Sequence, residues 1–323
     1  MRNLFVIGNG FDLAHNMKTG FNHFRDYLST NYSILHSYAP PYVPETITGH
    51  HEEELQDTTE VVGLIAYLLD EAAADTGNEN DWSKIEDLLG KLNLPECFDN
   101  VEPQYDKEGD RNYSWEYENA ESICGNMALA IPYITELLSE WIHTIEIPVS
   151  PIKRFSKMIN PRKDLFLTFN YTQTLEKLYG CAAENVCHIH GIASDDSCLQ
   201  TDKLILGHCG QIDYLNNKEV PYDMGDGLQA IYESLRKNTS EQIMLHEDFF
   251  KKINCEEIDK IYSFGFAFAD VDLPYMRKLC NSIDTKNITW WLNTHSGIQE
   301  CKRHMEILRS CGFQGAFCTY SID

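Results

Sequence analysis

From residue 163 to the C-terminus, short apolar runs alternate with segments of helical periodicity. The runs predict strands at 163–169, 185–190, 203–207, 260–265, 287–293 and 316–320, and an earlier run predicts one at 4–7. The helices expected in this half of the chain cover 172–180, 227–252, 272–281 and 297–311. Strands that alternate with helices form a central, mostly parallel sheet with helices on both faces. We therefore expect an α/β fold of the Rossmann type.

The region from 34 to 160 has helical patterns in place of strand patterns. Within it, helices are expected over 52–75, from Asp81 onward, 118–147 with a kink at Pro132, and 152–159, with loops at 36–50 and 95–117, whereas the helix expected at 21–32 belongs to the preceding segment 1–33. The sequence thus predicts a Rossmann-like core of 1–33 and 161–323, interrupted by a helical layer or subdomain at 34–160. Whether that region is a lid, a homo-oligomer interface or a partner site is left open.

The charge and cysteine content exclude several classes of protein. The formal net charge is −24, so most of the surface repels nucleic acid and anionic lipid, and a nucleic-acid partner is not expected. The 11 cysteines contain no C-x-x-C pair, which favours reduced thiols. The chain has no apolar run of membrane-spanning length and no apolar leader, so we expect a cytoplasmic protein without a membrane partner.

The first predicted strand ends in Gly8-Asn9-Gly10-Phe11-Asp12. Two glycines let a backbone turn sharply and approach a ligand, and a following helix N-terminus suits a phosphate. Leu13 occupies the third glycine position of G-x-G-x-x-G, and no Gly-Lys-Ser/Thr of a P-loop follows. The motif therefore predicts either a nucleotide-binding loop or a glycine turn that only closes the strand.

Polar side chains follow the other predicted strands at the point where each strand ends. Ligands of such sheets bind beyond the carboxyl ends of the strands, so these residues are expected to meet at one rim. The predicted ligand-binding residues are Gly8, Asn9, Gly10, Phe11, Asp12, Thr19, Thr168, Thr172, Gly191, Gly265, Phe266, Asp270 and Asn293, and the predicted catalytic residues are Asn170 and His190.

Several of these residues have simpler interpretations. Asn170 could cap the following helix, and Asp270 and Asp272 are more often helix caps than catalysts. His188 is expected to have a structural role. Cys187, His190, His208 and Cys209 do not have the spacing of a zinc finger or ribbon, so no metal site is predicted.

At this point the chain resembles a known family. The segments Gly8-Asn-Gly-Phe-Asp-Leu-Ala-His15 with Thr19, Trp82-Ser-Lys-Ile-Glu86, Thr168-Phe-Asn-Tyr-Thr172, His188-Ile-His-Gly191 and Ser263-Phe-Gly-Phe-Ala-Phe-Ala-Asp-Val-Asp272 are similar to the signature of the bacteriophage abortive infection AbiH family. They occur in family order from residue 4 to about 293. The resemblance implies an anti-phage protein of bacteria.

The AbiH pattern in turn resembles, more distantly, the sirtuin-like NAD-binding fold. That likeness implies that Gly8 and Gly10 hold phosphate, that Asn170 contacts a ribose, and that His190 is the catalytic base. Sirtuin-like domains in bacterial immunity often hydrolyse NAD, so the implied cofactor or substrate is NAD or a related nucleotide. The alternative is a non-catalytic nucleotide sensor that acts through a partner.

Three departures from these patterns affect the interpretation. Thr172 stands where sirtuins carry an aspartate, and Asp12 adds negative charge beside any phosphate. Asn16 stands where the AbiH signature usually has glycine, and the four-cysteine zinc ribbon of sirtuin deacylases is absent. Cleavage of the bond to nicotinamide would still be served by an amide at Asn170, a base at His190 and a carboxylate at Asp12 or Asp270.

Overall fold

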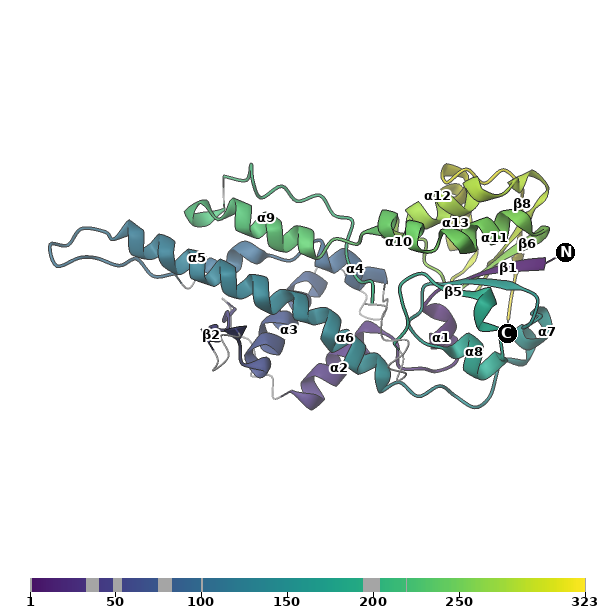
Figure 1. Cartoon of the computed structure of the whole chain (residues 1–323), viewed down its shortest axis with the longest axis horizontal. Coiled ribbons are helices and arrows are strands. Elements are labelled where there is room, and N and C mark those ends of the chain that lie inside the picture. The colour runs from purple at the N-terminus through teal and green to yellow at the C-terminus, as the bar shows by residue number, and fades with distance from the viewer. Residues whose placement is uncertain are drawn as a thin grey trace. The chain divides into compact units, whose positions relative to one another are not determined.

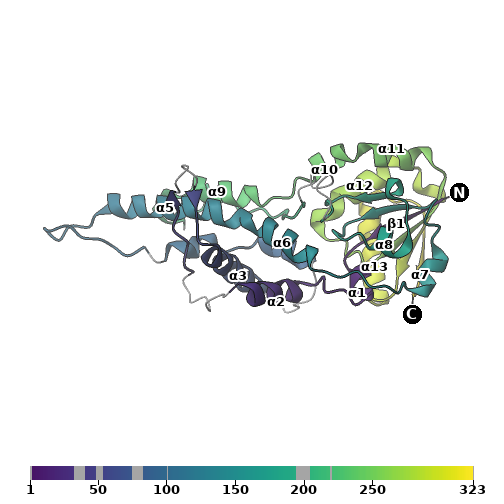
Figure 2. The ribbon, with the colours of Figure 1, turned by 60° about the horizontal axis from the view of Figure 1, so that its bottom comes forward.

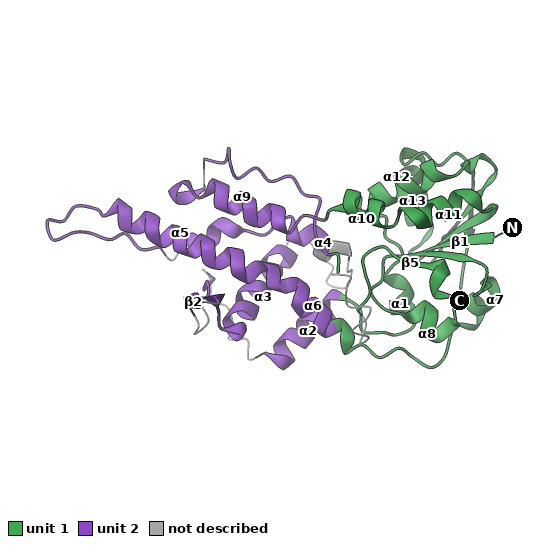
Figure 3. Ribbon diagram, viewed as in Figure 1, with its two compact units in different colours: residues 1–20, 142–205, 238–323 green, residues 21–141, 206–237 purple. Residues whose placement is uncertain are grey.

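The computed structural model describes residues 2–32, 41–48, 54–74, 83–99, 101–193, 204–218 and 220–322. The chain divides into two compact units (Figure 3). Unit 1 comprises residues 1–20, 142–205 and 238–323, and unit 2 comprises residues 21–141 and 206–237. Compared with the division expected from the sequence, 142–160 falls in the unit that contains the large sheet, and both 21–33 and 206–237 fall in the other unit.

Unit 1 is built on a six-stranded parallel sheet. Its strands are β1 (Arg2–Ile7), β4 (Leu165–Thr168), β5 (Val186–His188), β6 (Ile258–Phe264), β7 (Thr289–Asn293) and β8 (Ala316–Tyr320). They lie in the order β5-β4-β1-β6-β7-β8, and every neighbouring pair is parallel. Numbered by their sequence within this sheet, the order is 3-2-1-4-5-6, which is that of doubly wound dinucleotide-binding sheets. The predicted α/β fold is confirmed.

Alternate residues of β1 face two separate hydrophobic cores. Leu4 and Val6 pack in the core that α11 (Glu247–Cys255), α12 (Leu273–Ser282) and α13 (Ile298–Ser310) complete. Phe5 and Ile7 pack in the other core, with side chains from α1 (Gly10–Ala14), α7 (Lys153–Met158) and α8 (Thr174–Tyr179). Figures 1 and 2 show these two groups of helices around the sheet. Burial on both sides explains why the sequence of β1 is apolar without alternation.

Unit 2 is mainly helical. It contains α2 (Phe21–Asn31), α3 (Thr58–Ala74), α4 (Ser83–Leu89), η1 (Leu94–Phe98), α5 (Tyr113–Ala130), η2 (Ile131–Tyr133), most of α6 (Ile134–His143), η4 (Pro221–Asp223) and α9 (Gly225–Ser234). A small antiparallel pair, β2 (Ile47–Thr48) and β3 (Glu54–Leu55), was not expected from the sequence. The helix α5 packs against α9 and α3, so the two chain segments of this unit share one core.

The strand expected at 203–207 was wrong, because residues 204–207 form no strand. The main-chain groups in this part of the chain have other partners. Ile205 N donates to His190 O at 2.9 Å. Just after this segment, His208 N donates to Leu235 O at 3.1 Å, and His208 O accepts from Lys237 N at 3.0 Å. An apolar run alone does not reveal such isolated pairings.

Two long helices expected from the sequence are divided in the structure. The expected helix 227–252 is three helices, α9, α10 (Thr239–Leu245) and α11, and Asn238 caps α10 by accepting from Glu241 N at 3.2 Å. The break expected at Pro132 is present as the 3-10 turn η2 between α5 and α6. The expected loop 95–117 was wrong at both ends, because η1 lies at Leu94–Phe98 and Asn112 caps α5 at Tyr113. The predicted helix start at Asp81 and Trp82 lies outside the described residues.

Two further observations concern the whole described chain. The ten cysteines among the described residues are all free thiols. Among the helices that the structure describes, none is both long and apolar enough to span a bilayer.

Candidate functional site

The loop after β1 lies directly against the loop after β6. A Cβ atom at Gly8 would lie 2.5 Å from Gly265 O, and one at Gly10 would lie 2.7 Å from Gly265 Cα. Gly265 has a φ of +66°, and a Cβ there would lie 2.2 Å from Phe11 N. The three predicted glycines therefore permit close contact between two loops at the carboxyl ends of neighbouring strands.

The main-chain donors of this loop are already used within the protein. Gly8 N donates to Phe264 O at 3.1 Å, Gly10 N to Gly265 O at 3.0 Å, and Phe11 N to Gly8 O at 2.9 Å. The Phe11 side chain is fully buried, and its ring packs on those of Phe155 and Phe264 at 5.1 Å. The prediction that this loop holds phosphate stays a prediction, and it has no support from these three N–H groups.

Asp12 is the centre of a buried polar cluster, although it lies on the short helix α1. Its side chain is 1% exposed, and Oδ2 accepts a hydrogen bond from Thr172 Oγ1 at 2.5 Å. Thr172 Oγ1 also lies 3.0 Å from Thr174 Oγ1. Thr172 does not cap α8, because its hydroxyl group is bound to Asp12 and the residue at the N-cap position is Gln173.

Asn170 connects this cluster to a buried histidine at the end of β5. His188 Nδ1 lies 3.0 Å from Asn170 O, and His188 Nε2 lies 2.8 Å from Glu176 Oε1 on α8. Both ring nitrogens face acceptor oxygens, so the cationic form of the ring can donate to both. His188, for which a structural role is expected from the sequence, thus belongs to the polar cluster around Asp12.

Burial raises the pKa of Asp12 from 3.8 to about 6. The side chains of Thr172, Thr174 and Asn170 and the charge of His188 each favour the carboxylate and partly offset that rise. Desolvation therefore outweighs the polar neighbours, which leaves a carboxyl group that changes protonation state near neutral pH. Buried groups with such pKa values are concentrated at functional sites.

His190 lies in a second group of contacts at the same end of the sheet. Its Nε2 is 3.3 Å from Asp272 Oδ1, and its ring packs near those of Phe169, Tyr171 and Tyr275. The strand expected over 185–190 ends at His188, so His190 lies beyond the strand. Asp272 occupies the N-cap position of α12 but makes no side-chain cap, and its carboxylate faces His190 instead.

The remaining predicted residues make mainly local contacts. Asn9 Nδ2 donates to Thr19 O at 2.9 Å, and Asn170 N donates to Thr168 Oγ1 at 3.1 Å. Gly191 is buried with a φ of +86°. The other three candidates are Phe266, whose ring packs on Phe169 at 4.3 Å, Asn293, which accepts from His295 N at 2.9 Å, and Asp270, which is exposed.

Two motif residues that had no assigned role have structural ones. Asn16 has a φ of +58°, a left-handed conformation in which asparagine is the common substitute for glycine. Buried His15 lies 2.7 Å from Phe11 O and 2.6 Å from the Tyr179 hydroxyl, so it connects α1 to α8. These contacts hold α1, and with it Asp12, in place.

Sequence reasoning missed Thr174 and Glu176 and did not pair His190 with Asp272. Thr174 and Glu176 lie on α8, and only the fold brings that helix to β5 and α1. The available signal was the position of α8 directly after the rim residues Asn170 and Thr172.

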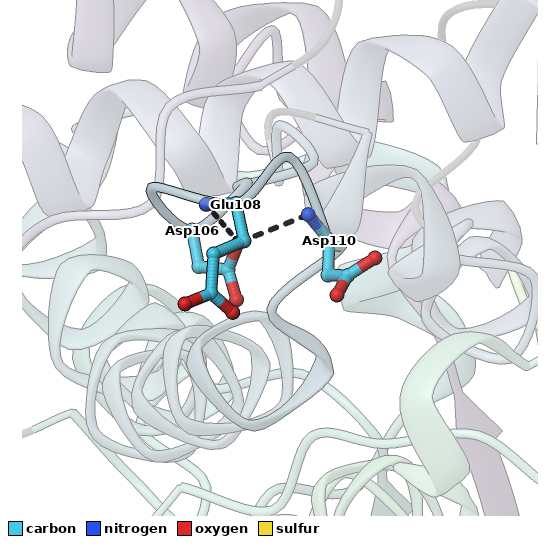
Figure 4. Close-up of side chains that lie close together, drawn as sticks. All are labelled: Asp106, Glu108 and Asp110. Carbon is cyan, nitrogen blue, oxygen red and sulfur yellow. Dashed lines mark hydrogen bonds between the residues drawn. The ribbon is translucent and has the colours of Figure 1, made fainter.

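A search of the described residues for metal-ligating side chains finds one group, Asp106, Glu108 and Asp110, shown in Figure 4. All three are exposed, and Asp106 Oδ1 accepts from the main-chain N–H groups of Glu108 and Asp110 at 2.8 and 2.9 Å. These bonds explain the arrangement as a turn, so we assign no metal to it.

Comparison with known proteins gives one family. A family model described as bacteriophage abortive infection AbiH matches residues 4–294. No curated protein and no solved structure matches the chain. The match begins within β1 and includes β4 to β7 and both groups of rim contacts described above.

Proposed function

Because the chain belongs to the bacteriophage abortive infection AbiH family, we propose that it acts in that defence by binding NAD or a related nucleotide and hydrolysing the N-glycosidic bond to nicotinamide. Family membership supports the role in phage abortive infection. The nucleotide and the reaction are our proposal.

One observation carries the proposal. In a sheet of order 3-2-1-4-5-6, the carboxyl ends of β1, β4 and β5 lie at the rim where such sheets bind dinucleotides. At or just beyond these strand ends, Asp12, Asn170 and His188 lie in one buried cluster. A cluster of buried polar groups with a carboxyl group of raised pKa fits a site better than a packing core.

The His190–Asp272 pair fits the chemistry of the proposed reaction. A base accepts a proton from water as the oxygen atom attacks the ribose carbon, while the bonding electrons leave with the ring nitrogen of nicotinamide. The products are ADP-ribose, nicotinamide and a proton. A carboxylate 3.3 Å from His190 Nε2 would orient the ring for this transfer.

The test is release of nicotinamide from NAD by the purified protein. We expect His190→Ala and Asn170→Ala each to slow release by roughly 100-fold or more, the range for loss of a general base or a positioned polar group. His304→Ala is the matched control, because His304 is also buried and lies 3.1 Å from a carboxylate, Glu300, but on α13.

The outcomes separate the two candidate functions. The hydrolase is supported if the wild type and the His304→Ala control release nicotinamide and both site variants do not. Binding of NAD by calorimetry without release would favour the non-catalytic sensor, a reading consistent with Thr172 at the position where sirtuins carry an aspartate. If the protein neither binds NAD nor releases nicotinamide, the nucleotide proposal is contradicted.

A further inference from the structure

Two buried oxygen atoms of the Asp12 cluster have no hydrogen-bond donor in the described structure. They are Asp12 Oδ1 and Asn170 Oδ1. The two residues are 1% and 6% exposed, and they are near enough that Asn170 favours the ionised form of Asp12. A buried acceptor without a donor costs about 1–3 kcal/mol, so two in one cluster call for a ligand that donates.

The loop beside them offers few donors to an anion. The N–H groups of Gly8, Gly10 and Phe11 all donate to protein carbonyl groups, and α1 has only five residues. A phosphate there would also lie beside the Asp12 carboxylate, which repels it. Two adjacent hydroxyl groups of a ligand, in contrast, can donate to carboxylate and amide oxygens without electrostatic repulsion.

We propose that Asp12 Oδ1 and Asn170 Oδ1 accept the hydroxyl groups of a ribose, so that the sugar, and not a phosphate, lies against the loop after β1. This inference rests on the proposed nucleotide-binding function. It assigns Asp12 as a sugar-binding residue and gives the ligand class as a riboside with free hydroxyl groups.

A ribose and a phosphate beside Asp12 predict opposite effects of pH on binding affinity. Hydroxyl donors favour the carboxylate, so affinity for a riboside should rise as pH increases through about 6, where Asp12 ionises. A phosphate at the same place should bind more weakly over that interval. The charged groups that face Asp12 from neighbouring elements are His188 on β5 and, through it, Glu176 on α8.

The experiment is calorimetric titration of the whole protein with ADP-ribose and with phosphate-free nicotinamide riboside, at pH 5 and pH 8. We expect Asp12→Asn to weaken binding of both ligands at pH 8 by about 10- to 100-fold, the range for one hydrogen bond to a charged group. Wild-type affinity should be lower at pH 5. Asp248→Asn, on the exposed surface of α11, is the control and should bind like the wild type.

Unchanged or tighter binding by Asp12→Asn, or wild-type affinity that rises toward pH 5, would overturn the inference. The wild-type pH comparison decides the question even if the variant does not fold. Binding with the expected pH dependence but without nicotinamide release would leave the inference in place and remove hydrolysis from the proposed function. A wild type that binds neither ligand would overturn both.

Discussion

Replacing Lys237 with methionine is expected to lower the free energy of unfolding by about 3–5 kcal/mol, the usual cost of removing one partner of a buried ion pair. Lys237 Nζ lies 2.5 Å from Glu86 Oε1 in unit 2, and the two side chains are 0% and 4% exposed. The substitution leaves the Glu86 carboxylate in the interior without this partner. Urea denaturation followed by circular dichroism measures the change.

The exposed pair Lys251–Asp248 provides the matched control. Those side chains are 65% and 100% exposed, so Lys251→Met should change stability by less than about 1 kcal/mol. The double variant Glu86→Leu/Lys237→Met should be more stable than Lys237→Met, because it removes both charges. Equal losses of unfolding free energy for Lys237→Met and Lys251→Met would contradict the expected cost of breaking the buried pair.

Replacing Asp12 with asparagine is expected to raise stability at pH 8 by up to about 3 kcal/mol, the equivalent of a pKa rise of about two units. The folded-state pKa is above the unfolded value, so the carboxyl group favours folding below about pH 4, and that contribution is lost as pH rises through about 6. The gain from Asp12→Asn should therefore be near zero at pH 4 and complete above pH 7.

Urea denaturation of the wild type and Asp12→Asn at several pH values tests this dependence. Asp248→Asn should show no such gain, since that side chain is fully exposed. A variant that is less stable than the wild type at pH 8 would mean that the hydrogen bonds to Asp12 outweigh its burial. A gain in stability together with weaker ribose binding is the behaviour of a site that is costly to maintain.

Much of the fold follows from the sequence because it depends on local pattern. The apolar runs at 4–7, 287–293 and 316–320 fall on β1, β7 and β8, and Pro132 marks the break between α5 and α6. The run at 203–207 failed because its neighbourhood pairs with residues near Leu235, some 30 positions later. Such a pairing depends on the tertiary structure and leaves no periodicity in either segment.

The site was predicted less completely, for a related reason. The strand ends identified Asp12, Asn170 and His190 as rim residues, since the carboxyl ends of parallel strands share one edge. Their spacing in the sequence does not show which of these residues are in contact. Thr172 meets Asp12 across 160 positions of the chain, and His188 meets Glu176 through the packing of α8. The raised pKa of Asp12 depends on burial that is visible only in the folded structure.

The position of β1 in the middle of the sheet has a consequence for how the protein forms during synthesis. Leu4 pairs with Leu165 on one side and with Ile261 on the other. At the usual rate of translation, the first of these partners follows β1 by roughly 10–30 s. Until then an apolar strand remains without its sheet, and a product that ends before Leu165 lacks both neighbours of β1. Chaperone dependence and aggregation of such truncated chains are therefore expected properties of this topology.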